Sequence, residues 1–537
     1  MNKIAHYLNS NLVGEVLTTP MIRLNYSRDR SVLRLIPNSV ALPRNTDDIR
    51  KIAKLAWQLG EKGRPLALTA RGRGHSQTGA AIGKDIIIDF NRHLNKIIDI
   101  DPNQGLIHVQ AGIEMSQILA VAQSHGLSLP FEANPRQTIG GVLSSNNAEL
   151  DLEKIKDLSQ AIDQLEVVLA NGDVIQTRRI SKRELSKKLG QPGLEGDIYR
   201  QIDQLIEENS AILNKIDTER IDNTGYHSLA LVKQKDGSFD LSPLFIGAQG
   251  TLGLITEAII KLDILSPKKI VIAASFLSIE DALDAQEGII KLHPSCCNIY
   301  HANILSGAIE NGKQFSFYDQ AFENFAQAPA VCLTANFNLK NRPHHKIISK
   351  KIEQIVKSKK GFVVISDDKN LAQLEAIKDT PLLFSNINDD LQNIPLINGI
   401  QVPITYFREF ITRLNGVAEL LNINLPYYGS CTSGIINIQT ELNLKLVSDK
   451  QKVFRLLSAI TKLAKDNNST ICAGEGEGRL KAPFAYQLLD PKLREIFTRL
   501  RRVFDAQAVL NPGVKESVPL KDLISATVND YYNGIFY

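Results

Sequence analysis

The chain has 537 residues, of which 43% are hydrophobic and 22% are charged, as in an ordinary soluble globular protein. The formal net charge of +4 is small for this length, so the chain lacks the strongly basic balance of a nucleic-acid-binding protein. The length exceeds what one hydrophobic core serves and predicts two or three domains.

The cysteines and the N-terminus indicate a compartment. Five cysteines, an odd number with no C-x-x-C spacing, favour a reducing environment over a disulfide framework. The N-terminus lacks the apolar core of a signal peptide, and no run of eighteen apolar residues occurs. We therefore expect a cytoplasmic protein without a transmembrane segment, and peripheral membrane contact stays open. The Lys-rich stretch 350–360 alternates with apolar residues and predicts a solvated helix face.

Helices and strands alternate in the first half of the chain. The predictions, in chain order, are a helix over 46–60, strands over 86–89 and 106–111, a helix over 116–125, and strands over 165–170 and 174–177. Thr46-Asp47-Asp48 is expected to cap the first helix, and Gly126 to end the second. Asn171-Gly172 predicts a tight hairpin turn.

The second half begins after a polar, mostly helical excursion over 181–244, and its pattern changes near Ser266-Pro267. The predictions that follow are strands over 270–276, 330–336 and 362–365, and helices over 279–292, 344–358, 406–421 and 491–505. A loop through Pro395 and a turn at Asn398-Gly399 are expected between them. This alternation predicts an antiparallel sheet with helices on one face.

The most informative stretch runs from Leu68 to Gly79 and reads Leu-Thr-Ala-Arg-Gly-Arg-Gly-His-Ser-Gln-Thr-Gly. Small β-compatible residues lead into a glycine-rich turn, which lets backbone N–H groups approach a diphosphate closely. The G-x-G-x-x-G fingerprint is not met, because Gln77 stands at its last position, and the stretch from Gly79 to Lys84 is not a Walker loop. The stretch resembles the first FAD-binding loop of the vanillyl-alcohol oxidase/p-cresol methylhydroxylase superfamily.

Further segments are similar to the same superfamily. Residues 139–146 resemble its second flavin-contacting segment, a Gly-Gly turn that feeds a short helix. Residues 245–257 resemble the G-S-E-G-T-L-G-I-I-T-E signature of FAD-linked 2-hydroxyacid dehydrogenases, with Gln249 in place of the usual Glu. Leu510-Asn511-Pro512-Gly513 resembles the closing L-N-P-G-K. With two weaker segments, the resemblance covers residues 26–515 in order and spacing.

The resemblance implies an α+β fold: a PCMH-type two-subdomain FAD-binding domain with an α+β cap domain of an antiparallel sheet plus helices. The domains that it implies are a lead-in over 1–35, the FAD-binding domain over 36–265, the substrate or cap domain over 266–470, a segment over 471–515 that returns to the FAD-binding domain, and a tail over 516–537.

FAD is the cofactor that the resemblance implies. The residues expected to bind it are Arg71, Gly72, Arg73, Gly74, His75, Ser76, Gln77, Gly79, Thr138, Gly140, Gly141, Ser144, Ser145, Gly250, Gly253, Ile255 and Asn511. In cytokinin dehydrogenases and related oxidases a Gly-His-Ser carries the flavin covalently on the histidine, which here is His75. The 2-hydroxyacid dehydrogenases of similar outline hold FAD non-covalently, so both modes of attachment stay open.

The same resemblance raises the question of a metal. Many 2-hydroxyacid dehydrogenases carry an H-A-G-D-G-N-L-H segment and a later G-E-H-G that together bind a divalent cation. Here Ser430 and Asn437 stand at the histidine positions of the first segment, and the second reads Gly474-Glu475-Gly476-Glu477. No histidine follows His345, so an imidazole-ligated site cannot form there, and we expect no metal. A loose hard-cation site formed by Glu475, Glu477 and Ser430 stays open.

Loss of these histidines also removes the base that the resemblance would supply. Oxidation of a hydroxyl by flavin needs the C–H hydride aimed at the ring and an acceptor for the O–H proton. Our candidate catalytic residues are Tyr428, Glu475 and Arg479, with Arg479 available to bind a carboxylate. The alternative for residues 475–478 is a glycine-rich turn that only positions the cap.

The function that the resemblance implies is an FAD-dependent oxidoreductase acting on a CH–OH group by hydride transfer to flavin. The expected substrate is a small 2-hydroxy acid, as for D-lactate and glycolate dehydrogenases. The first alternative is a covalent-flavin oxidase of the cytokinin or sugar-alcohol type, and the second is a flavin-fold protein without catalysis. The expected partners are a small-molecule substrate and an electron acceptor (oxygen, a quinone or a cytochrome), with no nucleic acid.

Overall fold

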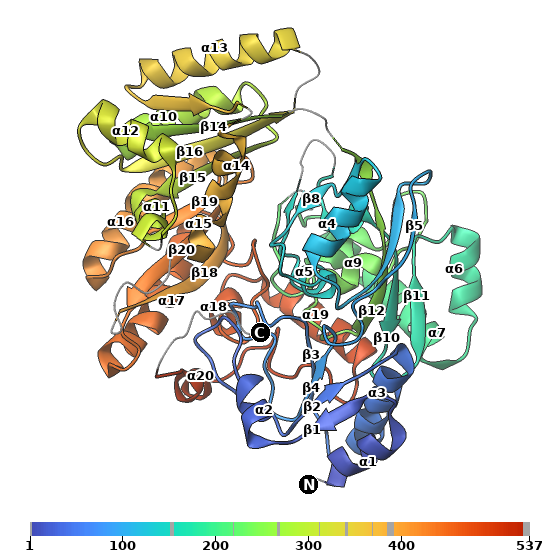
Figure 1. The fold of residues 1–537 in the computed structure, drawn as a ribbon. Coiled ribbons are helices and arrows are strands. Elements are labelled where there is room, and N and C mark those ends of the chain that lie inside the picture. Colours follow the sequence, from blue (N-terminus) through green and yellow to red (C-terminus); the bar gives the residue numbers. More distant parts are fainter. Residues whose placement is uncertain are drawn as a thin grey trace. The chain divides into compact units, whose positions relative to one another are not determined.

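The computed structural model describes residues 3–150, 155–217, 220–265, 269–310, 312–338, 342–367, 369–383 and 391–529. The chain divides into two compact units. The first comprises the chain up to Leu265 together with Cys472–Val528, and the second is formed by the chain between these parts (Figure 1). Ser266-Pro267, where the sequence pattern changes, lie outside the described residues, as do residues 530–537 of the tail.

The first unit opens with a four-stranded sheet in the order β1-β2-β4-β3. Its strands are β1 (Glu15–Leu17), β2 (Ser39–Leu42), β4 (Ile86–Asp89) and β3 (Leu68–Arg71). Strands β2, β3 and β4 run parallel, and helix α3 (Thr46–Glu61) provides the crossover that parallel strands require. The α3 cap is Asn45, whose side chain accepts the N–H of Asp48, so the predicted cap was placed one residue late.

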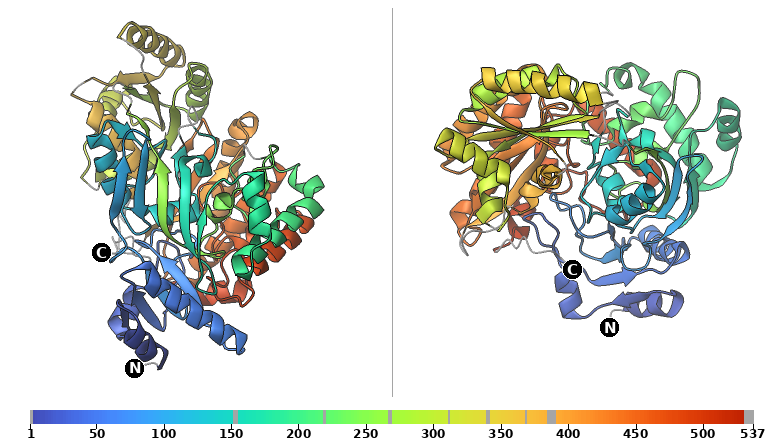
Figure 2. Two further views of the ribbon diagram at one scale, coloured as in Figure 1. Left: turned by 90° about the vertical axis from the view of Figure 1, so that its right-hand side faces the viewer. Right: turned by 45° about the horizontal axis from the view of Figure 1, so that its top comes forward.

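A five-stranded antiparallel sheet follows, in the order β11-β10-β12-β6-β5. Its strands are β11 (Val174–Thr177), β10 (Ile162–Val168), β12 (Leu254–Lys261), β6 (Leu106–Gln110) and β5 (Ile97–Asp101). The left view of Figure 2 shows green β12 lying between blue β6 and teal β10, although it comes much later in the chain. The predicted strands over 106–111, 165–170 and 174–177 are confirmed within a few residues.

Short helices and strands connect these sheets. The helices are α1 (Lys3–Asn11), α2 (Pro20–Asn25), α4 (Met115–Ser124), α5 (Ile139–Ser145), α6 (Lys182–Leu189), α7 (Gly193–Glu208), α8 (Ser210–Leu213) and α9 (Ser242–Phe245). Two small ladders pair β7 (Leu127–Ser128) with β13 (Asp263–Ile264), and β8 (Phe131–Glu132) with β9 (Glu149–Leu150). Gly140 and Gly141 lie inside the first turn of α5, which corrects the expectation that they precede it.

The carboxyl-terminal part of the first unit carries α18 (Ala482–Ala485), α19 (Pro491–Phe504) and α20 (Leu520–Ala526). Between α19 and α20 the chain passes along β3. Leu68 N donates to Val509 O at 2.8 Å, and Asn511 N donates to Leu68 O at 2.8 Å. Leu510 and Leu68 thereby form a parallel bridge, so the end of the chain continues the edge of the first sheet.

The second unit is built on a seven-stranded sheet in the order β17-β14-β16-β15-β19-β20-β18, and every pairing is antiparallel. The strands are β14 (Lys269–Phe276), β15 (Cys296–His301), β16 (Val331–Asn338), β17 (Phe362–Ile365), β18 (Gln392–Gln401), β19 (Tyr427–Ser430) and β20 (Ile435–Leu442). The helices are α10 (Ile279–Ile290), α11 (Ala302–Glu310), α12 (Ser316–Phe325), α13 (Arg342–Ser358), α14 (Leu371–Glu375), α15 (Thr380–Leu383), α16 (Phe407–Leu421) and α17 (Val447–Asp466). The predicted antiparallel sheet is confirmed.

Two expectations for the second unit are wrong. Pro395 and Asn398-Gly399 lie within β18 at register shifts against β20, where an irregular strand tolerates Pro and a Gly with a φ of 80°. Helices cover both faces of the sheet rather than one. Val271 and Ala273 pack with residues of α11, α12 and α14, while Ile270 and Ile272, which point to the other face of the same strand, are also fully buried.

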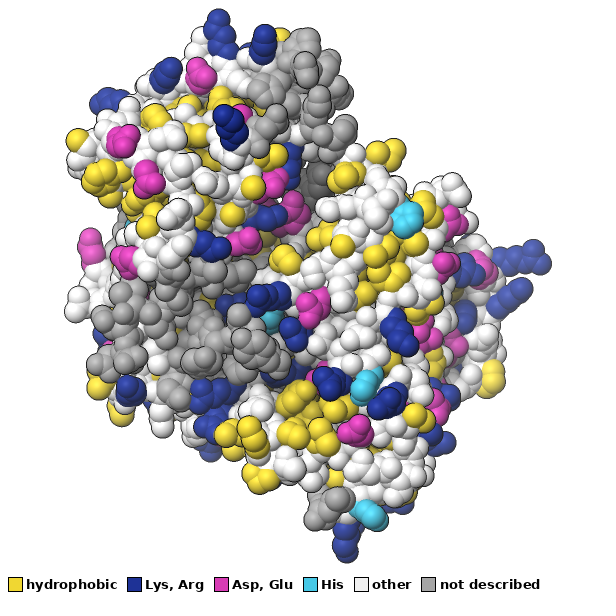
Figure 3. All heavy atoms as spheres, viewed as in Figure 1, with side chains coloured by type: hydrophobic (Ala, Val, Ile, Leu, Met, Phe, Trp, Pro, Cys, Tyr) yellow, Lys and Arg dark blue, Asp and Glu magenta, His cyan; other side chains and the backbone are white. Residues whose placement is uncertain are grey.

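Helix α13 carries the Lys-rich stretch as predicted. Ile348, Ile352 and Val356 are buried, whereas Lys350 and Lys357 are exposed. In Figure 3 dark blue side chains lie at the top of the view, where Figure 1 places α13, in keeping with a solvated helix face. Within the described residues, no helix combines the length and apolar character needed to cross a bilayer.

Candidate functional site

An open pocket of about 840 Å³ lies in the first unit, where β3, α5 and β12 meet. Its lining residues are Ala70, Arg71, Gly72, Arg73, Gly74, His75, Ser76, Ala80, Ala81, Phe90, Ala111, Gln137, Thr138, Gly140, Gly141, Ser144, Ser145, Asn147, Gln249, Gly250, Gly253, Leu254, Ile255 and Glu475. Most residues selected from the sequence therefore come together around one space. Gln77, Gly79 and Asn511 are the selected cofactor residues that do not line it.

The glycine-rich loop, residues 72–79, forms one wall of this pocket. Gly74 has a φ of 70°, and a Cβ there would lie 2.2 Å from Nη2 of Arg71. A Cβ on Gly72 would lie 2.1 Å from Oγ1 of Thr138. Glycine is thus required both for the turn and for the close approach of the loop to α5. No backbone N–H of residues 72–76 donates a hydrogen bond to another described residue, so this wall offers a row of free donors.

His75 projects into this setting as a neutral ring. Its Nδ1 is buried and has no hydrogen-bond partner among the described residues. Burial, together with the positive charges of Arg30, Arg73, Arg71 and Arg136, lowers the pKa of His75 to about 3. An uncharged imidazole with an unsatisfied nitrogen at a pocket wall suits attachment to, or contact with, a bound group.

Glu475 reaches the same loop from the far end of the chain. It is 1% exposed. Its Oε1 accepts hydrogen bonds from Oγ of Ser76 at 2.5 Å and Oγ1 of Thr78 at 3.1 Å, and its Oε2 accepts from N of Gln77 at 3.1 Å. Burial raises the pKa of Glu475, while the Ser76 hydrogen bond and the charge of Lys481 oppose that rise. Of the three candidate catalytic residues, Glu475 is the one that lines the pocket.

Asn511 and Arg479 lie behind the loop and are occupied by the protein. Asn511 Nδ2 donates to the carbonyls of Ala80 at 2.8 Å and Gln249 at 2.9 Å. The Arg479 guanidinium donates to Ile82 O at 3.0 Å, Asn511 Oδ1 at 3.0 Å and Pro512 O at 2.5 Å, and the side chain is nearly buried. Burial lowers the pKa of Arg479 to about 10. These contacts leave Arg479 no free face for a substrate carboxylate.

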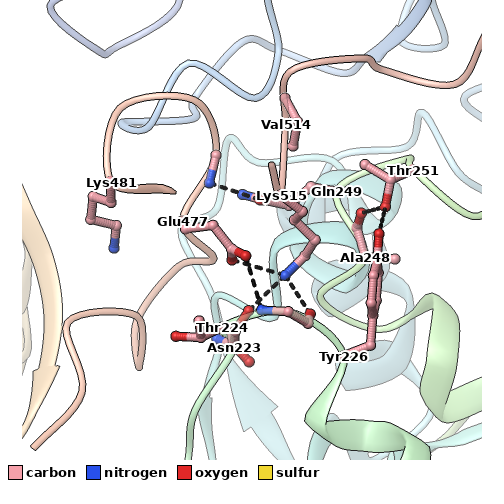
Figure 4. Close-up of polar contacts among 12 residues, drawn as sticks. Asn223, Thr224, Tyr226, Ala248, Gln249, Thr251, Glu477, Lys481, Val514 and Lys515 are labelled. Atoms are coloured by element: carbon pink, nitrogen blue, oxygen red, sulfur yellow. Dashed lines mark hydrogen bonds and ion pairs between the residues drawn. The ribbon is translucent and has the colours of Figure 1, made fainter. Parts of the chain in front are cut away.

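Glu477 points away from the pocket into a buried ion pair, drawn in Figure 4. Lys515 Nζ lies 3.0 Å from Oε2 of Glu477, and both side chains are 0% exposed. The same ammonium donates to the carbonyls of Asn223 at 2.6 Å and Gly225 at 2.7 Å. Glu477 Oε1 accepts the N–H of Gly225 at 2.9 Å. The pair therefore joins three chain segments in the core of the first unit, around residues 223–225, 477 and 515.

The residues aligned with the metal segment lie in the second unit. Tyr428 on β19 pairs with Asn437 on β20 and packs beside the buried cluster of α11 and α12. Asn437 Oδ1 accepts the N–H of Gly399 at 2.8 Å, and Ser430 Oγ lies 2.9 Å from Oγ1 of Thr432. Across the described ranges, no group of three or more His, Cys, Asp or Glu side chains gathers as a metal site would.

The pocket fits FAD on this geometry: free N–H donors, two glycines whose Cβ atoms would clash, and an orphaned imidazole nitrogen. Sequence reasoning missed several lining residues, among them Phe90 and Ala111. Phe90 follows directly after β4 and Ala111 directly after β6, one strand from each sheet. The residues at the ends of the predicted strands were therefore the signal that could have identified them. Gln249 was recognised only as a departure from a motif, and its positive φ of 54° marks the turn it occupies.

Comparisons with known proteins agree with this site. A family described as "FAD binding domain" matches residues 37–178, and one described as "FAD linked oxidases, C-terminal domain" matches residues 265–514. A D-2-hydroxyglutarate dehydrogenase of Escherichia coli is 24% identical over 96% of this chain and 51% of its own length. A glycolate oxidase subunit of Bacillus subtilis is 24% identical over 91% of this chain and 92% of its own. The structure of p-cresol methylhydroxylase with substrate bound gives a TM-score of 0.63 at 14% identity, covering 97% of both chains.

The chain thus belongs to the FAD-linked oxidase family, with the FAD-binding domain and the C-terminal domain of that family and a fold like that of p-cresol methylhydroxylase. Within the family it is related to the 2-hydroxyacid dehydrogenases. It spans about half the length of the D-2-hydroxyglutarate dehydrogenases that it matches. The α+β fold inferred from the sequence is confirmed by the likeness to p-cresol methylhydroxylase.

Proposed function

We propose that this chain oxidises the CH–OH group of a small 2-hydroxy acid by hydride transfer to FAD. The single observation that carries the proposal is the pocket of the first unit, where the glycine-rich loop presents free N–H donors beside a neutral His75. The relatives named for D-2-hydroxyglutarate dehydrogenase and glycolate oxidase support the choice of a 2-hydroxy acid. FAD, when bound, supplies the hydride acceptor.

The protein's own residues bind and orient in this proposal. The N–H groups of residues 72–76 and the Arg71 side chain at the pocket wall suit an anionic diphosphate. Glu475, which lines the pocket, remains our candidate for accepting the substrate hydroxyl proton. Tyr428 lies in the second unit, and its catalytic role stays a prediction from the sequence. For Arg479 we propose a structural role in place of carboxylate binding, because three protein oxygens already occupy its guanidinium.

The test is reduction of the purified flavoprotein under anaerobic conditions. Rapid mixing with D-2-hydroxy acids should bleach the flavin absorbance, while polyols and amines should leave it oxidised. Chelator should not slow the reaction, since we expect no metal. A protein that takes up FAD but is reduced only by polyols would overturn the substrate class. A folded protein that refuses FAD would overturn the proposal altogether.

We also propose that His75 carries FAD covalently. Covalent attachment is favoured by a neutral imidazole with a nitrogen that no protein group occupies, and the buried Nδ1 of His75 has no hydrogen-bond partner among the described residues. After acid precipitation the flavin should remain with the wild-type polypeptide and be released from His75→Ala. Free FAD in the wild-type supernatant would instead mean non-covalent binding, as in the 2-hydroxyacid dehydrogenases.

The second candidate function, a covalent-flavin oxidase of the cytokinin or sugar-alcohol type, is favoured by the same His75. The two differ in electron acceptor, because an oxidase passes electrons to oxygen. Hydrogen peroxide formed in step with substrate would support the oxidase, and turnover only with a quinone or cytochrome would support the dehydrogenase. We propose a cytoplasmic location, which suits five cysteines of which none forms a disulfide in the described part of the chain.

A further inference from the structure

A carboxyl-terminal turn, residues 474–481, supports the glycine-rich loop, and its Glu475 lies at the pocket wall. The contacts converge on Thr78. Its carbonyl accepts the N–H groups of Arg479 at 2.9 Å and Leu480 at 3.0 Å. A Cβ at Gly478 would lie 2.3 Å from Thr78 Oγ1, so the two segments approach as closely as backbone allows. The loop therefore takes its shape from residues that lie about 400 positions later in the sequence.

The direction of the hydrogen bonds requires the side chain at position 475 to be a hydrogen-bond acceptor. Ser76 Oγ accepts the N–H groups of Thr78 at 3.3 Å and Ala80 at 3.2 Å, so its own proton is directed to Glu475. Gln249 Oε1 accepts the N–H of Gly478 at 3.0 Å, which turns its Nε2 toward Thr78 Oγ1 at 3.5 Å. The Thr78 hydroxyl then also donates to Glu475.

Three donors thus converge on one side chain: two hydroxyl protons and the N–H of Gln77. A carboxylate satisfies them because it only accepts, whereas an amide brings two protons of its own. The carbonyl of Glu475 in turn accepts from Lys481 Nζ at 3.0 Å, which fixes the backbone of the turn. Both ends of the residue are therefore held.

We propose that Glu475 is a positioning residue for the cofactor. By holding Ser76, Gln77 and Thr78 it fixes the glycine-rich loop, and with it the place of His75 and of the free N–H donors that precede it. This inference rests on the proposed function, since it requires that the pocket bind FAD. It gives position 475 a role in loading FAD, where the family resemblance implies a part in a metal segment.

The test compares Glu475→Ala, Glu475→Gln and a matched control, Glu477→Gln, each as full-length apoprotein from flavin-starved cells. Two quantities are measured: amide hydrogen exchange at Gln77, Thr78 and Ala80 before FAD is added, and the rate of FAD incorporation afterwards. Glu475→Ala should lose protection at these amides and load FAD at least roughly ten-fold more slowly, because buried donors lose a charged acceptor.

The two glutamine variants separate positioning from general stability. Glu475→Gln should fall between wild type and Glu475→Ala, since its amide can serve the hydroxyls or the Gln77 N–H but not all three. Glu477→Gln makes the same chemical change two residues away, against Lys515. It should lower the unfolding temperature while leaving loop exchange and FAD loading as in wild type.

Unchanged exchange and loading in Glu475→Ala would overturn the inference. If Glu475→Ala does not fold, the double variant Ser76→Ala/Thr78→Val removes two of the donors instead, and it should give the same loss of loading. Wild-type protein that shows a protected loop but takes up no FAD would refute the proposed function. The exchange data would still decide whether Glu475 holds the loop.

Discussion

His75 stays uncharged because its surroundings penalise a proton twice. Burial removes water from the ring, and four arginines add like charge around it. The sequence identifies His75 through its place in a Gly-His-Ser turn, but the arginines come from three separate stretches of chain, so their joint effect on the pKa cannot be foreseen from the turn alone. A neutral histidine in the folded state has a direct consequence for stability.

Acid should destabilise the first unit through His75. The folded pKa of about 3 lies below the ordinary value of about 6.5, so between these pH values the unfolded chain binds the proton more readily. The stabilisation is fully present above pH 6.5 and is lost as pH falls towards 3. We measure the free energy of unfolding of the apoprotein by urea at pH 7 and at pH 5. Its decrease between these pH values should be smaller in His75→Gln than in wild type. The single tryptophan, Trp57, lies on α3 and reports this unit by fluorescence.

His6→Gln is the control for that experiment, since His6 is exposed on α1 and should leave the pH dependence as in wild type. Equal pH dependence in wild type and His75→Gln would mean that the folded state tolerates a charged ring at this position. The apoprotein is used because bound flavin would absorb light and quench the fluorescence of Trp57.

Residue types alone did not separate pocket residues from residues behind the pocket. Arg479 and Asn511 were chosen because they sit in or beside matched motifs, and both lie within hydrogen-bond reach of each other and of the loop's supporting carbonyls. Whether a guanidinium faces substrate or backbone depends on contacts 400 residues apart in sequence, such as that between Arg479 and Ile82. Motif matching therefore selected residues that gather around one pocket but left the direction of each side chain open.

The glycine-rich loop behaves as an element whose shape two glycines enforce. Gly74 and Gly126 both have φ near 70°, but a Cβ at Gly126 would meet nothing within 4 Å. Alanine at either position costs about 1 kcal/mol for the left-handed backbone. Only at Gly74 does the new Cβ also displace the Arg71 guanidinium, which lines the pocket.

FAD binding should therefore distinguish these two substitutions. Gly74→Ala and Gly126→Ala should each lower the unfolding temperature of the apoprotein by a similar small amount. Titration with FAD should show normal uptake in Gly126→Ala and none, or severely weakened uptake, in Gly74→Ala. Equal uptake in both variants would mean that Arg71 moves aside without consequence and that the loop geometry is not what binds the cofactor.

Elements with a clear periodicity were predicted well, and irregular ones were not. Helices α3, α10 and α16 show apolar residues at helical spacing and were placed within a few residues. Strand β18 up to Gly399 was predicted as a loop and a turn, with extended chain only over 400–402, because Pro395 and Gly399 are turn residues in most contexts. In the fold they occupy bulges that the neighbouring strand β20 accommodates, which is a tertiary effect that no local pattern carries.

Across the whole chain, the buried Glu477–Lys515 pair joins the carboxyl-terminal segment to residues 223–225. Breaking such a pair leaves an uncompensated charge in the core and costs about 3–5 kcal/mol. Lys515→Met should therefore lower the free energy of unfolding of the first unit by about that amount. The double variant Glu477→Gln/Lys515→Met should recover part of the loss, because no charge is then stranded. Urea unfolding followed by Trp57 fluorescence measures both, and additive losses would contradict a coupled pair.

The return of the chain end to β3 also sets the order of events during synthesis. Leu68 emerges from the ribosome long before Val509 and Asn511, the residues that complete its hydrogen bonding. Contacts between residues so far apart in the sequence form slowly, and until they form the β3 edge of the four-stranded sheet stays unpaired. The hydroxyl groups of Ser76 and Thr78 likewise lack their acceptor until Glu475 has been synthesised. A nascent chain consequently has no finished cradle for flavin until residues 475–511 have been synthesised, so flavin binding must follow their synthesis.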